Sequence, residues 1–444
     1  MPDRDDAMHD RTDDEPLATP AEEPPSEQEI EDLSRPGGTL ALIRVFRHRN
    51  YRLFFSGQLI SLMGTWMQNV AQSWLVYSLT HSPLLLGVTS FSATVTVFFV
   101  TPFGGMVADR VDRRKMLLFT QSAAMIQAVV LAALTLMNVI RVWEIIALAF
   151  CLGFINAFDV PSRQSMTLDM VAKEDLRHAI SLNSMMFNLA RIIGPSLAGA
   201  LIAIVGEGIC FALNSASFAA VLTSLVLMRL PRRPRRVNDR ALKEIVAGYR
   251  YSLSKPQLRT SLLLVAVSSM FGAAYLTLMP AFARDILHGH STAYGTLMTS
   301  VGAGALMGAF ALSRIPERHL IFAPVAASLA FGVCLIMFAH SHILWLSVLL
   351  LLPTAASLML LGGTTNTIIQ LVSVENFRGR VISHYTQCFM GMMPWGSLLL
   401  GLLAGRLGVS NAVTIGASVV IAAALIAYFM RRGTVWSVDQ VAAE

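Results

Sequence analysis

Charge is scarce in this sequence. Charged residues make up 14% of its 444 positions, whereas a soluble domain carries about 25%. Hydrophobic residues make up 54%, and the mean hydropathy is +0.58. Burial in a soluble core cannot account for so much apolar sequence. A bilayer can, because about 20 consecutive apolar residues cross it as a helix. The composition therefore excludes an ordinary soluble protein and favours a membrane protein.

Cysteine and the signatures of catalysis are scarce as well. The four cysteines stand alone in apolar runs, without metal-ligand spacing, so we expect small core residues rather than disulfides or metal ligands (Cys151, Cys210, Cys334 and Cys388). The sequence lacks a phosphate-binding glycine loop with lysine and serine or threonine, which argues against an ATP-driven pump. It also lacks an acid, base or nucleophile set converging at one membrane face, as a membrane-bound acyl or glycosyl transferase requires. We therefore expect no metal, no cofactor and no enzymatic activity.

The charges that are present divide unequally along the chain. Residues 1–36 hold 13 of the 28 acids and three bases, and this polar segment is predicted to be a disordered acidic tail. The remaining bases lie in short loops between apolar runs rather than in one patch, so they indicate membrane orientation and not nucleic-acid binding.

Twelve apolar segments predict an all-α polytopic membrane protein with twelve transmembrane helices. An amphipathic lead-in opens a first six-helix half at 37–229, a basic linker covers 230–258, a second six-helix half covers 259–432, and a tail follows at 433–444. The segments lie at about 53–79, 84–107, 116–138, 143–166, 180–205, 208–229, 260–286, 293–312, 320–340, 343–372, 381–406 and 410–430. With the N-terminus in the cytoplasm, only Arg141, Arg284 and Arg406 fall on the opposite side, so both termini are predicted to be cytoplasmic.

The two halves resemble each other in sequence. At a constant offset of 202 residues, 179–206 aligns with 381–408, matching Gly194 with Gly396 and Gly206 with Gly408. Two parallel six-helix halves place a binding site near the bilayer midplane, where they meet, and access alternates as they rock.

The stretch "GMVADRVDRR" at 105–114 lies in the predicted loop between the second and third helices. It resembles the loop signature of the major facilitator superfamily, except that Asp112 stands at the usual glycine position. The resemblance implies a latch that holds the halves together in the outward-facing state, formed by Gly105, Asp109, Arg110, Arg113 and Arg114. A simple positive-inside anchor remains the alternative.

Two further motifs carry this resemblance into helices four and five. Asp159 and Arg163 stand one turn apart, and the family implies that Asp159 extends the charge relay of the latch; a proton-binding role is the alternative. "ARIIGPSLAG" at 190–199 resembles the antiporter motif of exporters in the superfamily, through Gly194, Pro195 and Gly199. A closely packed, kinked helix without a role in transport is the alternative.

A polar and aromatic set inside the predicted spans is expected to line the substrate cavity. Arg191 is costly in a bilayer unless it faces a cavity or a partner, so it would bind an anionic substrate group or pair with an intramembrane acid. Ordinary interhelical hydrogen bonding and packing is the alternative for each member of the rest of the set (Gln68, Asn69, Gln72, Trp74, Asn366, Gln370, Gln387 and Trp395).

The run "NAFDVPSRQSMTLDMV" followed by "NSMMFNLARIIGPSLAG" resembles the branch of the superfamily that includes bacterial enterobactin exporters and macrolide-efflux proteins. The resemblance implies a monomeric transporter of the bacterial inner membrane that exports a small amphipathic drug or siderophore by proton antiport. Its partners would be that substrate, protons and the lipid bilayer, and not nucleic acid. A lipid flippase on the same fold and a non-transporting receptor remain the alternatives.

Overall fold

The computed structural model describes residues 44–167, 170–228 and 241–431. For 97, 101–110, 165, 167, 173, 177, 241–246, 317 and 431 it describes the backbone alone. The tails predicted at 1–36 and 433–444 lie outside these ranges, as does most of the first half of the predicted linker.

The N-terminal half consists of a short lead-in and six long helices. Residues Val45–Arg47 form a 3₁₀ turn, η1. The six helices follow as α3 (Arg49–Thr80), α4 (Pro83–Arg110), α5 (Arg113–Leu136), α6 (Val142–Thr167), α7 (Leu176–Val205) and α8 (Glu207–Leu227), with a 3₁₀ turn, η2 (Lys173–Asp175), before α7.

The C-terminal half repeats this plan with more interruptions. A linker helix, α9 (Ala241–Ser254), precedes it. The spans are α10 to η5 (Pro256–Ile286), α12 (Ser291–Leu312), α14 (Ala323–Ala339), α15 (Leu344–Val372), α16 to α17 (Glu375–Leu407) and α18 (Val409–Arg431), with a short α13 (Glu317–Leu320) before α14.

Two of these spans are not continuous α-helices. The seventh span runs through α10 (Pro256–Val267), a π segment η3 (Ser268–Gly272), a 3₁₀ segment η4 (Ala273–Leu278), α11 (Met279–Ala281) and a second π segment η5 (Phe282–Ile286). The eleventh runs through α16 (Glu375–Thr386), a π segment η6 (Gln387–Gly391) and α17 (Met393–Leu407). Such interruptions are tolerated in membrane helices where the freed backbone faces protein or a cavity.

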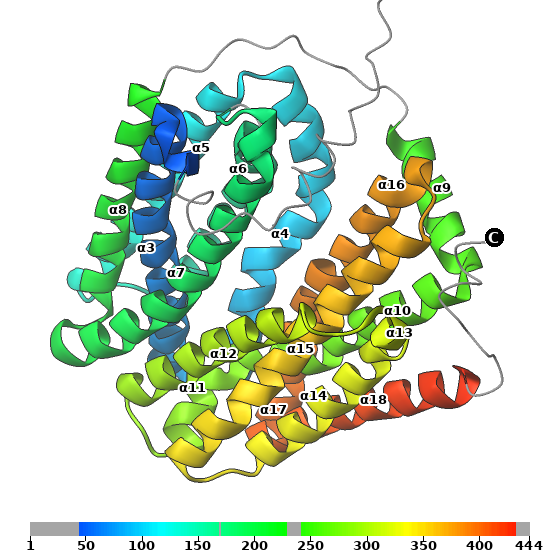
Figure 1. Ribbon diagram of the computed structural model, residues 1–444. Helices are drawn as coiled ribbons and strands as arrows, with labels where there is room; N and C mark the ends of the chain where they lie inside the picture. Colours follow the sequence, from blue (N-terminus) through cyan, green and yellow to red (C-terminus); the bar gives the residue numbers. More distant parts are fainter. Residues whose placement is uncertain (1–43, 168–169, 229–240, 432–444) are drawn as a thin grey trace, which may run out of the picture.

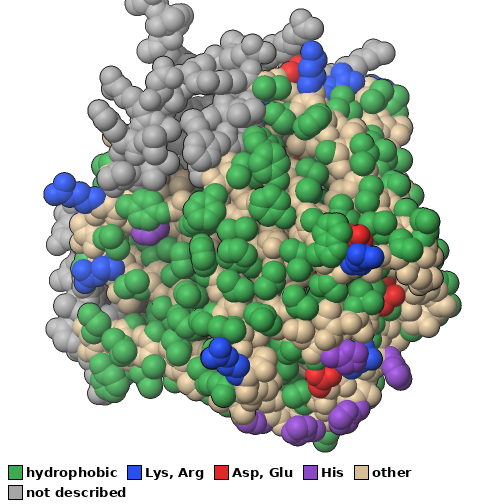
Figure 2. Space-filling view, turned by 180° about the vertical axis from the view of Figure 1, so that it is seen from behind, with side chains coloured by type: hydrophobic (Ala, Val, Ile, Leu, Met, Phe, Trp, Pro, Cys, Tyr) green, Lys and Arg blue, Asp and Glu red, His purple; other side chains and the backbone are tan. Residues whose placement is uncertain are grey.

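The helices of the two halves meet at one end of the molecule and separate towards the other (Figure 1). We call the end where α4 ends and α5 begins the basic end. We call the opposite end the histidine end, because its loops carry His81, His288, His290, His340 and His342. Figure 2 shows a face covered mostly by hydrophobic side chains, with histidines gathered along its lower edge.

The predicted twelve spans are confirmed. Ten of them are long and apolar enough to cross a membrane. The other two are α3, which has 32 residues, and α14, which is a shorter apolar helix. The prediction that all four cysteines are core residues is wrong for Cys151, whose side chain is exposed.

The internal repeat is visible in the backbone. Gly206 ends α7 with φ +82°, and Gly408 ends α17 with φ +86°, a left-handed conformation that favours glycine. Helix α7 crosses α3 at Gly194, where an added Cβ would lie 2.6 Å from the Cβ of Trp66. Gly396 crosses η3 in the same way, because a Cβ there would collide with the carbonyl oxygen of Met270. The fifth span therefore packs on the first as the eleventh packs on the seventh.

Candidate transport site

Two glycine crossings join the halves. Gly199 of α7 and Gly295 of α12 touch backbone to backbone, because a Cβ on Gly199 would lie 2.9 Å from the Cα of Gly295. Gly87 of α4 and Gly401 of α17 meet in the same way, with a Cβ on Gly401 lying 3.1 Å from the Cα of Gly87. Small residues allow such close approach in membranes, where helices associate through packing rather than the hydrophobic effect.

Hydrogen bonds and ring contacts add to these crossings nearer the histidine end. Tyr77 of α3 donates a short hydrogen bond to Asp285 of η5. In the middle of this interface, the hydroxyls of Ser397 and Thr277 lie 2.9 Å apart, and Ser90 lies 3.2 Å from Ser397. Hydrogen bonds and close packing thus hold the halves together, and the side chains that the structure describes form no ion pair between them. Such an arrangement can separate without leaving a buried charge unpaired.

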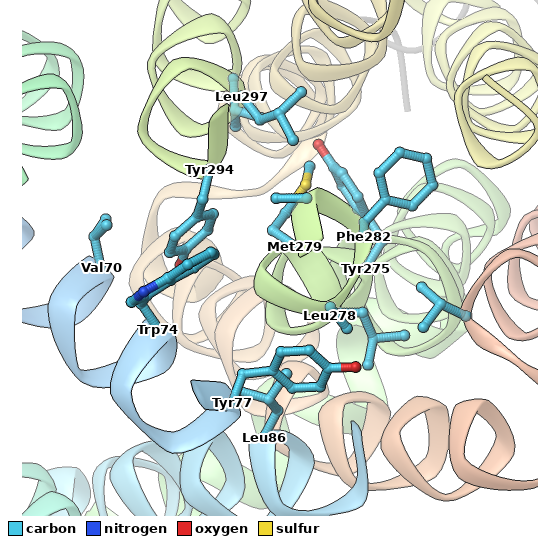
Figure 3. Packing of buried hydrophobic residues seen from close by; sticks show 14 of the residues in the cluster. Val70, Trp74, Tyr77, Leu86, Tyr275, Leu278, Met279, Phe282, Tyr294 and Leu297 are labelled. Carbon is cyan, nitrogen blue, oxygen red and sulfur yellow. The ribbon is translucent and has the colours of Figure 1, made fainter. Parts of the chain in front are cut away.

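An aromatic pair lies just inside this closed layer. The rings of Trp74 (α3) and Tyr294 (α12) stack with centroids 6.0 Å apart and planes at 18° (Figure 3). The Ser73 side chain lies within hydrogen-bonding reach of the Tyr294 hydroxyl. Trp74, which was predicted to line the substrate cavity, is 9% exposed and is packed between the helices in this conformation.

Arg191 lies in the middle of α7, among aromatic rings from both halves. Its guanidinium lies 5.8 Å from the ring centroid of Trp66, a cation–π distance. Tyr275 of η4, in the C-terminal half, lies within electrostatic range of this guanidinium. In the part of the chain with described side chains, no carboxylate lies within 4.0 Å of this guanidinium. An arginine at this depth is costly unless it meets an anion or a cavity.

The broken seventh span supplies the opposite wall. Tyr275 lies in its 3₁₀ segment, between the two π segments, and is 2% exposed. Discontinuous spans at the interface between repeats are typical of transporter binding sites. Gly272 and Pro280 lie within this interrupted region, but neither residue alone predicts a π or 3₁₀ segment.

Gln68 lies inside the N-terminal half rather than in a cavity. Its carbonyl accepts a hydrogen bond from Asn214 of α8 at 2.7 Å, and its amide donates to Gln127 of α5 at 3.2 Å. Gln127 in turn donates to the carbonyl oxygen of Leu148 on α6. Gln68 is 1% exposed, so this amide chain links α3, α5, α6 and α8.

Asn69, the next residue of α3, is not part of this buried amide chain. It lies on the face of α3 that also carries Trp66 and Ser73, and its side chain is exposed. Gln72 is 8% exposed, and its side chain is buried in the packing of α3.

The predicted cavity residues of the C-terminal half do not form one group. Trp395 (α17) meets the ring of Phe91 (α4) edge to face at 5.2 Å, so it packs between the halves. Gln370, near the basic end of α15, donates to Asn366 of the same helix at 3.4 Å. Gln387 begins the π segment η6.

The predicted latch is described only in part. The structure describes only the backbone at Gly105, Asp109 and Arg110, so the contacts predicted for the latch stay a prediction. Arg114 donates to the carbonyl oxygens of Leu225 and Val226 at 2.7 and 2.6 Å, and so caps the C-terminal end of α8.

Asp112 replaces the glycine of the loop signature without strain. Its φ is −59°, and its carboxylate accepts a hydrogen bond from the backbone N–H of Lys115 at 3.1 Å, which caps α5. Arg113 follows it as the first residue of α5 and has an interaction partner.

Asp159 and Arg163 form an ion pair one turn apart on α6. Asp159 is 1% exposed and also accepts hydrogen bonds from Thr120 at 2.8 Å and Gln121 at 2.7 Å, both on α5. These partners all belong to the N-terminal half, so the pair joins α5 to α6 in this conformation.

Sequence reasoning missed a buried carboxylate at the basic end. Asp175 is 0% exposed and binds Arg44 at 2.8 Å, Arg47 at 3.1 Å and His48 at 2.8 Å. Burial would raise the pKa of Asp175, but the hydrogen bonds from His48 and Arg44 and the charges of both arginines outweigh it, so the net pKa is lowered. The closely spaced bases Arg44, Arg47 and His48 in the lead-in were the sequence feature that pointed to an acidic partner.

Two similar six-helix halves around an interhelical site define a membrane transporter of the major facilitator fold, and not an enzyme. The chain belongs to the transmembrane secretion effector family of this superfamily, whose model matches residues 41–444.

Curated relatives of known activity match nearly the whole chain. The staphyloferrin A transporter of Staphylococcus aureus is 26% identical over 396 residues, which cover 86% of this chain and 96% of that protein. The enterobactin exporter EntS of Citrobacter koseri is 26% identical over 402 residues, with coverages of 89% and 95%.

Solved structures share the fold at low identity. A bacterial homologue of the human lysosomal transporter Spinster, in an inward-facing and occupied conformation, superimposes with a TM-score of 0.67 at 14% identity, covering 88% of this chain and 99% of that one. The nucleoside transporter NupG gives a TM-score of 0.62 at 14% identity, with coverages of 86% and 98%.

Proposed function

We propose that this protein exports a small anionic amphipathic molecule of the siderophore class across the bacterial inner membrane, by alternating access driven by proton antiport. One observation carries the proposal. Arg191 holds a charge in the middle of the membrane span, beside Trp66 and opposite Tyr275, without a carboxylate partner among the described residues. An anionic cargo with flat, unsaturated groups would supply both the missing countercharge and a stacking partner.

The relatives support this choice of cargo, because their names associate them with staphyloferrin A and enterobactin. The arrangement of the halves supports the transport cycle. They meet at the histidine end and separate towards the basic end, and the predicted orientation makes the basic end cytoplasmic (Figure 1). An exporter loads cargo from that side.

The test is efflux measured with inverted vesicles under an imposed pH gradient. Anionic chelators and a neutral macrolide would be compared for wild type, Arg191→Gln and Arg191→Lys, with Arg406→Gln as the control for loss of a base elsewhere. Removing the charge should weaken transport of anionic cargo about 30-fold, the effect of truncating one partner of a buried pair.

Arg191→Lys keeps the charge, so it should retain part of the transport of anionic cargo that Arg191→Gln loses. Arg406→Gln should transport anionic cargo as well as wild type does. Equal loss of anionic and neutral cargo in Arg191→Gln would make Arg191 a packing residue and refute the anion site. Transport at a rate that does not depend on the pH gradient would refute proton antiport, but it would not contradict the anion site at Arg191.

A further inference from the structure

A groove lies on the outer surface of the N-terminal half, between α5 and α6 near the basic end. It encloses about 320 Å³, and its lining is apolar except for Lys115 and Thr120 (Val111, Lys115, Met116, Phe119, Thr120, Phe154, Ile155 and Phe158). That volume is in the range of small-molecule sites. Because α5 packs on α6 and α8 of its own half, the groove does not belong to the transport site between the halves.

The groove has a charged residue at one end and an apolar lining along the rest, which matches an amphiphilic ligand. Lys115 lies in the first turn of α5, and Phe119 follows one turn deeper, about 6 Å along the helix axis. Phe119 is 73% exposed and Phe154 is 48% exposed, so both rings face the surrounding hydrocarbon rather than a protein core. The charged end therefore lies at the level of lipid headgroups, and the apolar part at the level of acyl chains.

The charges at the mouth of the groove favour an anion. Arg113, Arg114 and Lys115 are three consecutive bases at the start of a helix, where the helix dipole already favours negative charge. Arg114 donates hydrogen bonds to the end of α8, and the Asp112 carboxylate accepts a hydrogen bond from the start of α5. The Lys115 ammonium is exposed and forms no ion pair with any described residue.

We propose that this groove is a binding site for an anionic phospholipid, with one acyl chain against Phe119 and Phe158 and the phosphate at Lys115. The basic end supplies the excess positive charge that attracts anionic lipid to a membrane surface. The bound chain also touches Thr120, whose hydroxyl donates to Asp159 of the Asp159–Arg163 pair. The lipid thus contacts Thr120, one of the side chains that join α5 to α6.

Native mass spectrometry of the full-length protein tests the site, with phosphatidylglycerol and phosphatidylcholine of identical acyl chains as probes. Lys115→Gln should weaken the first phosphatidylglycerol about fivefold, the contribution of one lysine near an anionic surface. Arg314→Gln removes an exposed base at the same end of the other half and should leave that affinity unchanged. Ile155→Trp fills the groove and should weaken the same lipid although Lys115 remains.

Thermal unfolding of each variant would show that the fold is retained, and Lys115→Gln serves if Ile155→Trp proves unstable, because Lys115 is exposed. Phosphatidylcholine binding as tightly as phosphatidylglycerol would overturn the preference for an anion. Equal weakening by Lys115→Gln and Arg314→Gln would reduce the effect to general surface charge and overturn the site.

Discussion

Gly199 and Gly401 lie 202 residues apart in the sequence and occupy the same position in the two halves. Each brings its helix against a glycine of the opposite half, Gly295 for the first and Gly87 for the second. The two crossings are therefore related by the internal repeat. Contacts placed symmetrically about the centre allow the halves to rock as bodies, which is the motion that alternating access requires.

Enlarging Gly199 should prevent the halves from closing at the histidine end. In Gly199→Val the side chain would meet the Cα of Gly295 and the carbonyl oxygen of Ser291, so we expect transport to fall at least about tenfold. The matched control is Gly405→Val on α17, where an added Cβ meets nothing within 4 Å. Similar losses in both variants would contradict a special role for the crossing.

The hydrogen bond from Tyr77 to Asp285 should hold the histidine end closed. Tyr77→Phe removes one bond to a charged group, worth about 1.5–3 kcal/mol, and should shift the equilibrium towards opening at that end by about tenfold or more. Thiol labelling of Leu86→Cys would report the shift, because Leu86 of α4 is 2% exposed beside Tyr77 and opening would uncover it (Figure 3). Asp285→Asn keeps an acceptor oxygen and should shift the equilibrium less; a larger shift than in Tyr77→Phe would contradict this assignment.

Alanine substitutions of the adjacent amides Gln68 and Asn69 should affect different properties, stability in the first case and cargo binding in the second. Gln68→Ala leaves Asn214 and Gln127 without their partner inside the bundle, so it should lower stability by about 1–3 kcal/mol and leave cargo affinity unchanged. Asn69→Ala should leave stability unchanged and weaken cargo binding about fivefold. Thermal unfolding and ligand titration on the same two proteins measure both quantities, and the reverse pattern would place Gln68 in the cavity.

Asp175 should make attachment of the lead-in depend on pH. Its pKa in the folded protein is lowered from the ordinary value of 3.8, so the stabilisation is fully present above pH 3.8 and is lost as the pH falls through the lower folded value.

Asp175→Asn should imitate the protonated state and destabilise the lead-in by about 3 kcal/mol. Protection of residues 44–52 from hydrogen exchange, measured against the intrinsic rate at each pH, should then fall at pH 7 and should no longer respond to acid. Unchanged exchange in the variant would mean that packing of Val45 and Tyr51, both 0% exposed, holds the lead-in without the ion pairs.

The spans and the repeat could be predicted because they depend on apolar length and on glycines with fixed spacing. Gly206 and Gly408 illustrate this, since each ends a helix in a conformation that few other residues adopt. The direction of a side chain was harder to predict. Gln68 and Asn69 are chemically alike neighbours, and only the packing of α5 and α8 decides which one is buried.

The interruptions of the seventh span and the Asp175 cluster could not be predicted for a different reason. A π segment has no sequence period of its own, and Ser268–Gly272 reads as ordinary apolar helix. Arg44 and Asp175 are 131 residues apart, and their pairing depends on how the lead-in folds across the start of α7.

Reciprocal motion of the two ends is the central claim, and distances between spin labels measure it most directly. One label pair would join Val111 and Val374 at the basic end, and the other would join Val139 and Ile343 at the histidine end; all four side chains are exposed. Over the transport cycle, with cargo and a pH gradient, the basic-end distance should shorten while the histidine-end distance lengthens. Distances that change in the same direction at both ends, or at neither, would contradict alternating access in this protein.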